Sequence, residues 1–477
     1  MKTIGKNKRI ALAAILTAIT TAAALTGCNG KEATSASENA ASVSQAATQD
    51  EAKAAAQASG SGAQSGLQES DIVINDTIEN SEDGGHAIYA DGEAQAYSNT
   101  LVKKTGEADG DEADFYGENA AVFAANGGTL DLSDMVVKTD GTHANGVFSY
   151  GEGTTVNIED SYIETSGNCS GGLMTTGGGV MNAKNLTITT SGNSSAAIRS
   201  DRGGGTVNVT GGDYTTSGKG SPVIYSTADI TVNDATLTST ASQGVVVEGK
   251  NSVTLNNVQL TADNNTKNSN KSSWYQAVMI YQSMSGDAAE GTSAFTMNGG
   301  TLTNQNGDVF FVNNTATEIT LSNAQIKNNG DGVFLRAAAA GWGSEGSNGG
   351  QVTLNADNQK IEGDMIVDDV SHLNLYLKNS SAFTGAINSD GQAGEVYVEI
   401  GDGSTWTLTG DSYITSLTCG AGSINLNGHK LYVNGKEYTE GSASSGTAIA
   451  VQSTGGGHGA GGDRPDGNPP AKPGEDR

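Results

Sequence analysis

The stretch Val253-Thr254-Leu255-Asn256-Asn257-Val258-Gln259-Leu260 sets the pattern that the rest of the chain repeats. Apolar Val253 and Leu255 alternate with polar residues, which predicts a β-strand with one buried face. Asn257 then supplies a residue type that accepts a left-handed backbone at low cost, and the alternation resumes after it. The stretch therefore predicts two short strands joined by a sharp corner.

Eight further copies of this phrase align on Val253 and Leu255. Most successive copies begin 23 to 26 residues apart, and the two longer steps contain insertions. The aligned pairs are Leu130 and Leu132, Val156 and Ile158, Met181 and Ala183, Val207 and Val209, Ile230 and Val232, Phe295 and Met297, Ile319 and Leu321, and Val352 and Leu354.

The corner column has a restricted composition. The residues aligned with Asn257 are Asp134, Asp160, Asn185, Gly211, Asp234, Gly299 and Asn323, and only the last copy departs from this rule, with Ala356. A third short apolar run, such as Gly244-Val245-Val246, closes each unit. One such unit cannot bury its apolar face alone, but stacked units can. The sequence therefore predicts an all-β fold, a right-handed parallel β-helix, with the hand taken from the general chirality rule.

The composition limits the functions that are open to the chain. The 477 residues carry a formal net charge of −28, and charged residues make up 16% of the chain. An acidic surface repels nucleic acid and anionic lipid, so a role in nucleic-acid binding is not expected.

The first 28 residues form an export signal. A basic segment, Lys2 to Arg9, precedes an apolar run from Ile10 to Leu25, and Leu25-Thr26-Gly27-Cys28 follows. This segment resembles bacterial lipoprotein signal peptides. The resemblance implies cleavage before Cys28, a lipid on the Cys28 sulfur and a place on the outer face of a bacterial membrane. An ordinary secretory signal is the alternative, and both imply export.

The sequence divides into segments of different composition. Residues 28–68 are rich in Ala and Ser and are expected to be a disordered tether, and residues 441–477 are expected to be a disordered Gly- and Pro-rich tail. The β-helix is expected over residues 69–440, with an opening coil or cap at 71–128, regular coils at 129–356 and looser terminal coils at 357–440.

Late in the chain, Ser404-Thr405-Trp406-Thr407-Leu408-Thr409-Gly410-Asp411-Ser412, followed by Ile414 and Leu417, resembles the last coils of autotransporter passenger domains. These are β-helical bacterial surface adhesins, although no membrane β-barrel follows here. The fold is also similar to pectate-lyase-like β-helix enzymes, which cleave polysaccharides. Two roles are therefore open by resemblance, adhesion and polysaccharide cleavage.

The sequence offers little support for catalysis. The adjacent acids Asp368 and Asp369 point to opposite faces if they lie on a strand, and Arg199 next to Asp201 is better explained by a structural salt bridge. No His or Cys residues have metal-ligand spacing.

The insertions carry the best binding hypothesis. Insertions from Gln282 to Thr292 and from Ala337 to Gly350 follow corresponding strands two coils apart, so they should project from one side about 10 Å apart. A third loop, Asn264 to Ser273, lies on a neighbouring edge. Aromatic and polar side chains in such loops are typical of sugar binding. The candidate residues are Trp342, Arg336, Glu345, Tyr281, Asp287, Trp274 and Tyr275. The alternative is that the tryptophans fold inward as lids.

Metal and thiol chemistry leaves two further expectations. We expect no cofactor, and Ca²⁺ held by Asp109, Asp111 and Asp114 is the one open alternative to a solvated acidic loop. Cys169 and Cys419 lie about ten coils apart, too far for a bridge, and are expected to be unpaired thiols.

Together these features predict a lipid-anchored cell-surface protein that is adhesin-like or glycan-binding and non-catalytic. Its partners would be the membrane, through Cys28, and a polysaccharide or surface glycan. An extracellular polysaccharide lyase or hydrolase and a structural surface protein without a ligand are the alternatives.

Overall fold

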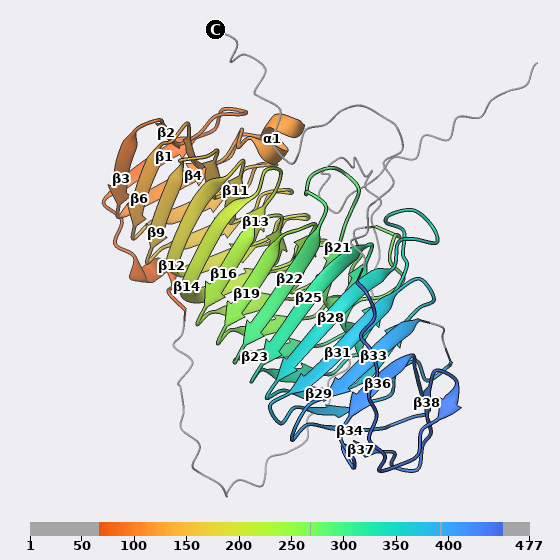
Figure 1. The fold of residues 1–477 in the computed structure, drawn as a ribbon. Helices are drawn as coiled ribbons and strands as arrows, with labels where there is room; N and C mark the ends of the chain where they lie inside the picture. The colour runs from red at the N-terminus through yellow and green to blue at the C-terminus, as the bar shows by residue number, and fades with distance from the viewer. Residues whose placement is uncertain (1–65, 268, 392–393, 452–477) are drawn as a thin grey trace, which may run out of the picture.

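The chain forms a right-handed parallel β-helix in a computed structural model that describes residues 66–267, 269–391 and 394–451. Its coils stack along one axis, with the first coils at one end of the rod and the last at the other (Figure 1). The predicted fold class is confirmed. The predicted signal peptide, Cys28, the tether up to residue 65 and residues 452–477 of the tail lie outside the described residues.

Two large sheets contain most of the described strands, a 21-stranded sheet, called sheet A here, and an 11-stranded sheet, called sheet B. The strands of sheet A are β1 (Asp76–Asn80), β3 (Ala94–Ser98), β4 (Thr100–Lys104), β6 (Thr129–Ser133), β7 (Val136–Thr139), β9 (Thr155–Glu159), β10 (Tyr162–Thr165), β12 (Gly179–Thr190), β14 (Gly205–Thr216), β16 (Asp229–Asn233), β17 (Thr236–Ser239), β19 (Ser252–Asn256), β20 (Gln259–Ala262), β22 (Thr292–Asn298), β23 (Thr301–Asn304), β25 (Thr315–Ser322), β26 (Gln325–Asn328), β28 (Gly350–Asp357), β31 (His372–Lys378), β33 (Glu395–Ile400) and β36 (Ser416–Cys419).

The strands of sheet B are β2 (Ile88–Asp91), β5 (Val122–Ala125), β8 (Val147–Tyr150), β11 (Leu173–Thr176), β13 (Ile198–Ser200), β15 (Ile224–Ser226), β18 (Val245–Glu248), β21 (Gln276–Tyr281), β24 (Asp308–Asn313), β27 (Val333–Ala337) and β30 (Asp364–Val367). Two small sheets close the late coils, one of β29 (Lys360–Glu362), β32 (Ala382–Thr384), β34 (Thr405–Thr407) and β37 (Ile424–Asn425), the other of β35 (Ser412–Ile414), β38 (Leu431–Val433) and β39 (Lys436–Glu437). The described helices are the short 3-10 helix η1 (Glu69–Asp71) and α1 (Asp111–Phe115).

The stacking register follows the repeat. In sheet A, Val253 pairs with Ile230 on one side and Phe295 on the other, and Leu255 pairs with Val232 and Met297. Side chains at these positions point inward and join one apolar core that runs from Ile88 to Leu431. The predicted alignment is confirmed for these copies, because each coil covers the apolar face of the one before it.

The last predicted copy is aligned wrongly by two residues. Ile319 pairs with Leu354 rather than Val352, and Leu321 pairs with Ala356. Ala356 is therefore an inward strand residue, and the corner falls on Asn358, at a φ of 47°. In this register the corner residue of the last copy is Asn358, so the rule that corners are Asn, Asp or Gly holds there too. Ala356 had been aligned with the corner residues although it is a small inward residue of the strand.

The corner residues adopt the left-handed backbone that the sequence predicted. Asn257 has a φ of 54°, Asp234 one of 53° and Asn323 one of 53°. The side chains also stack, since Nδ2 of Asn257 donates a hydrogen bond to Oδ1 of Asp234 at 2.7 Å. Asn and Asp thus fulfil two needs at the corner, a backbone that L-residues otherwise avoid and a bond to the next coil.

The ends of the rod are also regular. The segment expected to be a cap contributes β1 to β5, and β1 and β3 pair in parallel with β4 and β6. At the other end, residues of the expected tail are fixed by hydrogen bonds. Ser444 and Cys419 exchange two backbone hydrogen bonds of 3.0 Å, and the amide of Asn374 bonds both backbone groups of Ile449.

Three long loops leave from the edges of sheet B. Residues 263–275 precede β21, residues 282–291 follow it, and residues 338–349 follow β27. One strand, β24, lies between β21 and β27. The last two loops therefore start two strands apart, as the sequence predicted.

The corner can be tested at Asn257. We expect Asn257→Val to lower the free energy of unfolding by about 2 kcal/mol, because a β-branched residue is strained at positive φ and the bond to Asp234 is lost. Asn257→Gly is the control, since it loses the bond without the strain and should be clearly less destabilised. Urea denaturation of both variants measures the difference, and equal losses would show that the corner is not limited by its backbone.

Candidate functional site

The outer face of sheet B is covered by α1 and the long loops. Most of the candidate residues predicted from the sequence lie on or beside this face. Its strands place one outward row in register, and neighbours in this row include Met174 and Arg199, Arg199 and Tyr225, and Tyr225 and Val246. The row continues through Met279 and Phe311. Helix α1 lies against this face near one end, and the long loops project beside β21 (Figure 1). The face therefore carries two smaller apolar clusters, separate from the core inside the β-helix.

A buried polar cluster lies in the middle of this row. Nη2 of Arg199 donates to Oδ2 of Asp201 at 2.9 Å, and the two side chains are 3% and 0% exposed. The predicted structural salt bridge is confirmed. Burial raises the pKa of Asp201 to about 7, Asp287 and Glu248 add to the rise, and Arg199 opposes it. Carboxylates therefore outnumber the cations that compensate them here.

Glu248 is the second buried acid of this cluster. Its carboxylate accepts hydrogen bonds from the hydroxyls of Tyr225 and Tyr281, the latter at 3.0 Å. Burial raises the pKa of Glu248, although hydrogen bonds from Ser283 and Tyr225 oppose the rise. Tyr281, a predicted sugar-binding residue, is fully buried and serves this network instead. Sequence reasoning missed Glu248, because it follows the apolar run Val245–Val247 as an ordinary outward residue would.

Arg202 joins distant parts of the chain across this face. Its Nε donates to Asp287 at 2.6 Å and its Nη1 to Asp111 at 3.2 Å. Its guanidinium also lies 3.6 Å from the centre of the Phe115 ring. Asp287 was expected near Trp342, but it is buried against Arg202 and holds the loop at residues 282–291 down.

Trp342 folds inward. Its side chain is 3% exposed, and its ring centre lies 5.1 Å from that of Tyr281. Nδ2 of Asn348 donates to the Trp342 carbonyl at 2.8 Å and to the Ala340 carbonyl at 2.6 Å, so the loop is tied to itself. Of the two alternatives for this residue, the inward one is observed.

A small hollow of about 20 Å³ lies between this loop and the loop before β21. That volume holds one water molecule or one hydroxyl group. Among its lining residues, Asn264, Gln276 and Trp342 are buried, and each carries a side-chain atom without a hydrogen-bond partner, namely Oδ1, Oε1 and Nε1. Two unpaired acceptors and one unpaired donor thus belong to residues that line a space large enough for one hydroxyl.

Half-buried aromatic residues border the same hollow. Trp274 and Tyr275 both line it and are partly exposed. The Arg336 guanidinium lies 4.6 Å from the centre of the Trp274 ring, and Nζ of Lys267 lies 4.7 Å from that of Tyr275. Arg336 is itself paired with Asp308, at 2.6 Å. Glu345, the remaining candidate, is exposed on the loop tip.

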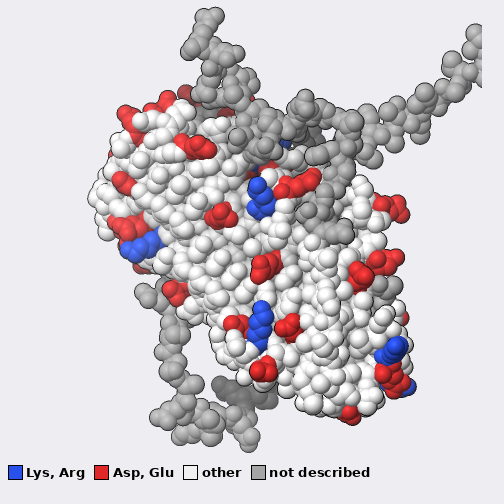
Figure 2. All heavy atoms as spheres, in the orientation of Figure 1, with Lys and Arg blue, Asp and Glu red and all other residues white. Residues whose placement is uncertain are grey.

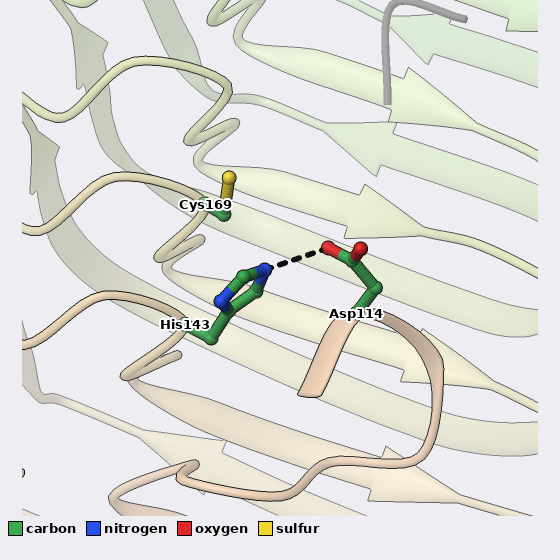
Figure 3. A group of neighbouring side chains, drawn as sticks. All are labelled: Asp114, His143 and Cys169. Carbon is green, nitrogen blue, oxygen red and sulfur yellow. Dashed lines mark hydrogen bonds and ion pairs between the residues drawn. The ribbon is translucent and has the colours of Figure 1, made fainter. Parts of the chain in front are cut away.

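The acids expected around a calcium ion do not converge. Asp109 accepts a bond from the Gly110 backbone, and Asp111 bonds Arg202. Asp114 lies instead with His143 and Cys169, whose ligand atoms and its own lie within 4.8 Å of one another (Figure 3). Among the described residues, this is the one such group of three or more His, Cys, Asp and Glu side chains.

The Asp114, His143 and Cys169 group holds α1 in place. Nε2 of His143 lies 2.8 Å from Oδ1 of Asp114, and Nδ1 lies 2.9 Å from the Ala108 carbonyl oxygen. Imidazole and thiolate suit zinc rather than calcium. Cys169, however, is disulfide-bonded, so the prediction of two unpaired thiols is wrong for Cys169 and holds for buried Cys419. The spacing argument had excluded only a bridge between those two.

Searches of known proteins add no assignment. No protein-family model, no curated protein and no solved structure matches the chain. Among the described residues, no helix has the length and apolar character needed to cross a bilayer.

The buried acids predict an unusual dependence of stability on pH. The pKa of Glu248 is higher in the folded protein than in the unfolded chain, so the folded protein keeps this proton to a higher pH. The contribution of Glu248 to the free energy of unfolding therefore falls as pH rises above about 4.5. We expect the stability of Glu248→Gln to fall less steeply between pH 4.5 and 7 than that of the wild type. Exposed Glu362→Gln is the control, and thermal unfolding across this range measures both. An unchanged slope in Glu248→Gln would contradict the assignment.

Proposed function

We propose that the protein is an exported, lipid-anchored surface protein that binds a glycan and does not catalyse its cleavage. The observation that carries this proposal is the hollow between the two loops, which is lined by half-exposed aromatic rings and by three residues that each carry a buried polar atom without a partner. A buried polar atom without a hydrogen-bond partner lowers the stability of the folded protein unless a water molecule or a ligand pairs with it.

A sugar hydroxyl has the chemistry that this hollow requires. It can donate to one of the oxygens of Asn264 and Gln276 and accept from Trp342, whereas a bare cation would leave the indole N–H unpaired. A single water molecule also satisfies these atoms, and a ligand hydroxyl that takes its place reproduces the same bonds. The parts of the Trp274 and Tyr275 rings that Arg336 and Lys267 leave exposed then offer apolar surface to a sugar ring.

The rest of the molecule supports a binding role. The acids that an enzyme would need, Asp201, Glu248 and Asp287, are all at most 4% exposed and engaged with arginine or tyrosine. Asp287 holds the loop at residues 282–291 in place, and Glu248 bonds Tyr281, against which Trp342 packs. The net charge of −28 also favours a sugar partner over nucleic acid.

The hollow can be tested by removing its polar atoms and its ring. We expect Asn264→Ala and Trp274→Ala each to weaken binding of short neutral saccharides roughly tenfold or more, because one hydrogen bond or one stacking face is lost. Binding is measured by calorimetry over a panel of mono- to trisaccharides.

The control for this test is Tyr413→Ala, which removes a half-exposed aromatic residue on a distant terminal coil. It should bind as the wild type does. If Asn264→Ala and Trp274→Ala also bind every active saccharide normally, the hollow is not the site.

Anchoring makes a separate prediction. If Cys28 carries a lipid, the exported protein should partition into detergent in phase separation, and Cys28→Ser should move it to the aqueous phase. A wild-type protein found only in the aqueous phase would contradict the anchor.

A further inference from the structure

A groove of about 830 Å³ crosses the outer face of sheet A, on strands far from the hollow. Two rows of outward side chains form its walls. Each of the five strands contributes one side chain to each row. The first wall is Ala96, Asp131, Asn157, Asn182 and Asn208, and the second is Ser98, Ser133, Glu159, Lys184 and Thr210. The residues between the walls, such as Leu132 and Ile158, point inward, so backbone forms the floor. We call this the axial groove.

The first wall is an amide ladder. Nδ2 of Asn208 donates to Asn182 at 2.9 Å, Asn182 donates to Asn157 at 2.9 Å, and Asn157 donates to Asp131 at 2.8 Å. Asn157 and Asn182 each use one N–H and one acceptor site in the ladder, and Asn208 uses one N–H. Each of the three amides keeps at least one N–H and one lone pair for a ligand. The ladder also fixes the side chains, so a ligand would not have to order them.

The spacing of the ladder selects among polymers. Its five strands are about 4.8 Å apart, so the axial groove is about 19 Å long. In a β-1,4-linked glycan the equatorial bonds keep the chain straight, and each ring advances by nearly this distance. About four rings would each meet one rung. An extended peptide, which advances about 3.3 Å per residue, does not keep this register.

The same face already holds an extended chain at its other end. Residues 444–449 run from β36 to β31 across the outward side chains of sheet A, and the end of the described chain is seen crossing these strands (Figure 1). Asn374 accepts from the Ile449 N–H and donates to the Ile449 carbonyl, both at 2.9 Å. Ser416 accepts from the Thr447 N–H at 2.9 Å. Outward polar side chains of this face thus bind a polymer that lies along the helix axis.

The charge of the axial groove points to an uncharged ligand. Lys184 pairs with Glu159 at 3.2 Å, which leaves Asp131 as the uncompensated charge of its walls. In the view of the described surface, charged side chains on this side are scattered among uncharged ones (Figure 2). A polyanion would meet repulsion from this acidic protein.

We propose that the axial groove binds an extended, uncharged β-1,4-linked polysaccharide, one sugar ring per coil. This proposal rests on the proposed function only in taking a glycan as the class of ligand. The groove and the hollow are separate sites, so either can fail without the other. The groove would then align a long chain with the rod, whereas the hollow would take a single sugar.

Calorimetry with cellohexaose, cellobiose and maltohexaose tests this proposal. Maltohexaose has the same six glucose rings in a coiled α-1,4-linked chain, so it controls for composition and length. We expect cellohexaose to bind at least tenfold more tightly than the other two. The double variant Asn157→Ala/Asn182→Ala should lose roughly tenfold for cellohexaose, the loss expected for two hydrogen-bonding side chains.

The matched control is Thr238→Ala/Thr261→Ala, which removes two outward, half-buried side chains of sheet A beyond the corner. It should bind cellohexaose normally, and thermal unfolding checks that both variants are folded. The proposal is overturned if cellohexaose and maltohexaose bind equally, if neither binds, or if the ladder variant binds as the wild type does. If Asn264→Ala binds short saccharides normally, only the proposed binding site at the hollow is contradicted, and the proposal for the axial groove is unaffected.

Discussion

At the corner between the two strands of each coil the backbone takes a positive φ, and this requires Asn, Asp or Gly. The requirement has a consequence for the whole rod, because a corner at the same place in every coil keeps Val253 over Ile230 and under Phe295. Where the corner residue is Asn or Asp, its side chain also bonds the next coil, as Asn257 bonds Asp234 and Asn185 bonds Asp160. Backbone geometry and stacking register are thus fixed by the same residues, and the inward columns follow from them.

In-register stacking also decides what the outer surfaces look like. Any outward residue recurs at the spacing of the coils, so similar residues in one column become a ladder. On sheet A these columns are polar and remain at the surface, which gives the amides of Asn157, Asn182 and Asn208 their regular spacing. On sheet B the outward column is mostly aromatic or aliphatic, with Arg199 and Arg336 among these residues. Such a face has to be covered, and the insertions that lengthen two of the coils are what cover it.

The sequence predicts the fold well because the repeat is a one-dimensional signal, and each position in it has one burial state. It predicts the site less well for physical reasons. Trp342 stands in a loop where nothing in the sequence tells whether the ring points to solvent or to Tyr281, and the structure turns it inward. Asn264 and Gln276 are ordinary polar residues until their surroundings bury them without partners. The register error at Val352 has a similar origin, since Ala356 is apolar but small and could pass for a corner.

The buried charges explain how the long loop at residues 282–291 keeps a defined place beside sheet B. Loops of ten or more residues lose much conformational entropy when they are fixed, and the loop at residues 338–349 is secured by the packing of Trp342 and by the hydrogen bonds that Asn348 donates. The loop at residues 282–291 is held instead by Asp287, which bonds Arg202, and Arg202 also contacts Asp111 and Phe115 on α1. Helix α1 is in turn bonded to His143 through Asp114. Because a buried ion pair is strongly destabilised when one partner is lost, this chain of contacts makes an open loop costly. The same contacts therefore hold the loop at residues 282–291 closed, and Asp201, Glu248 and Asp287 stay at most 4% exposed.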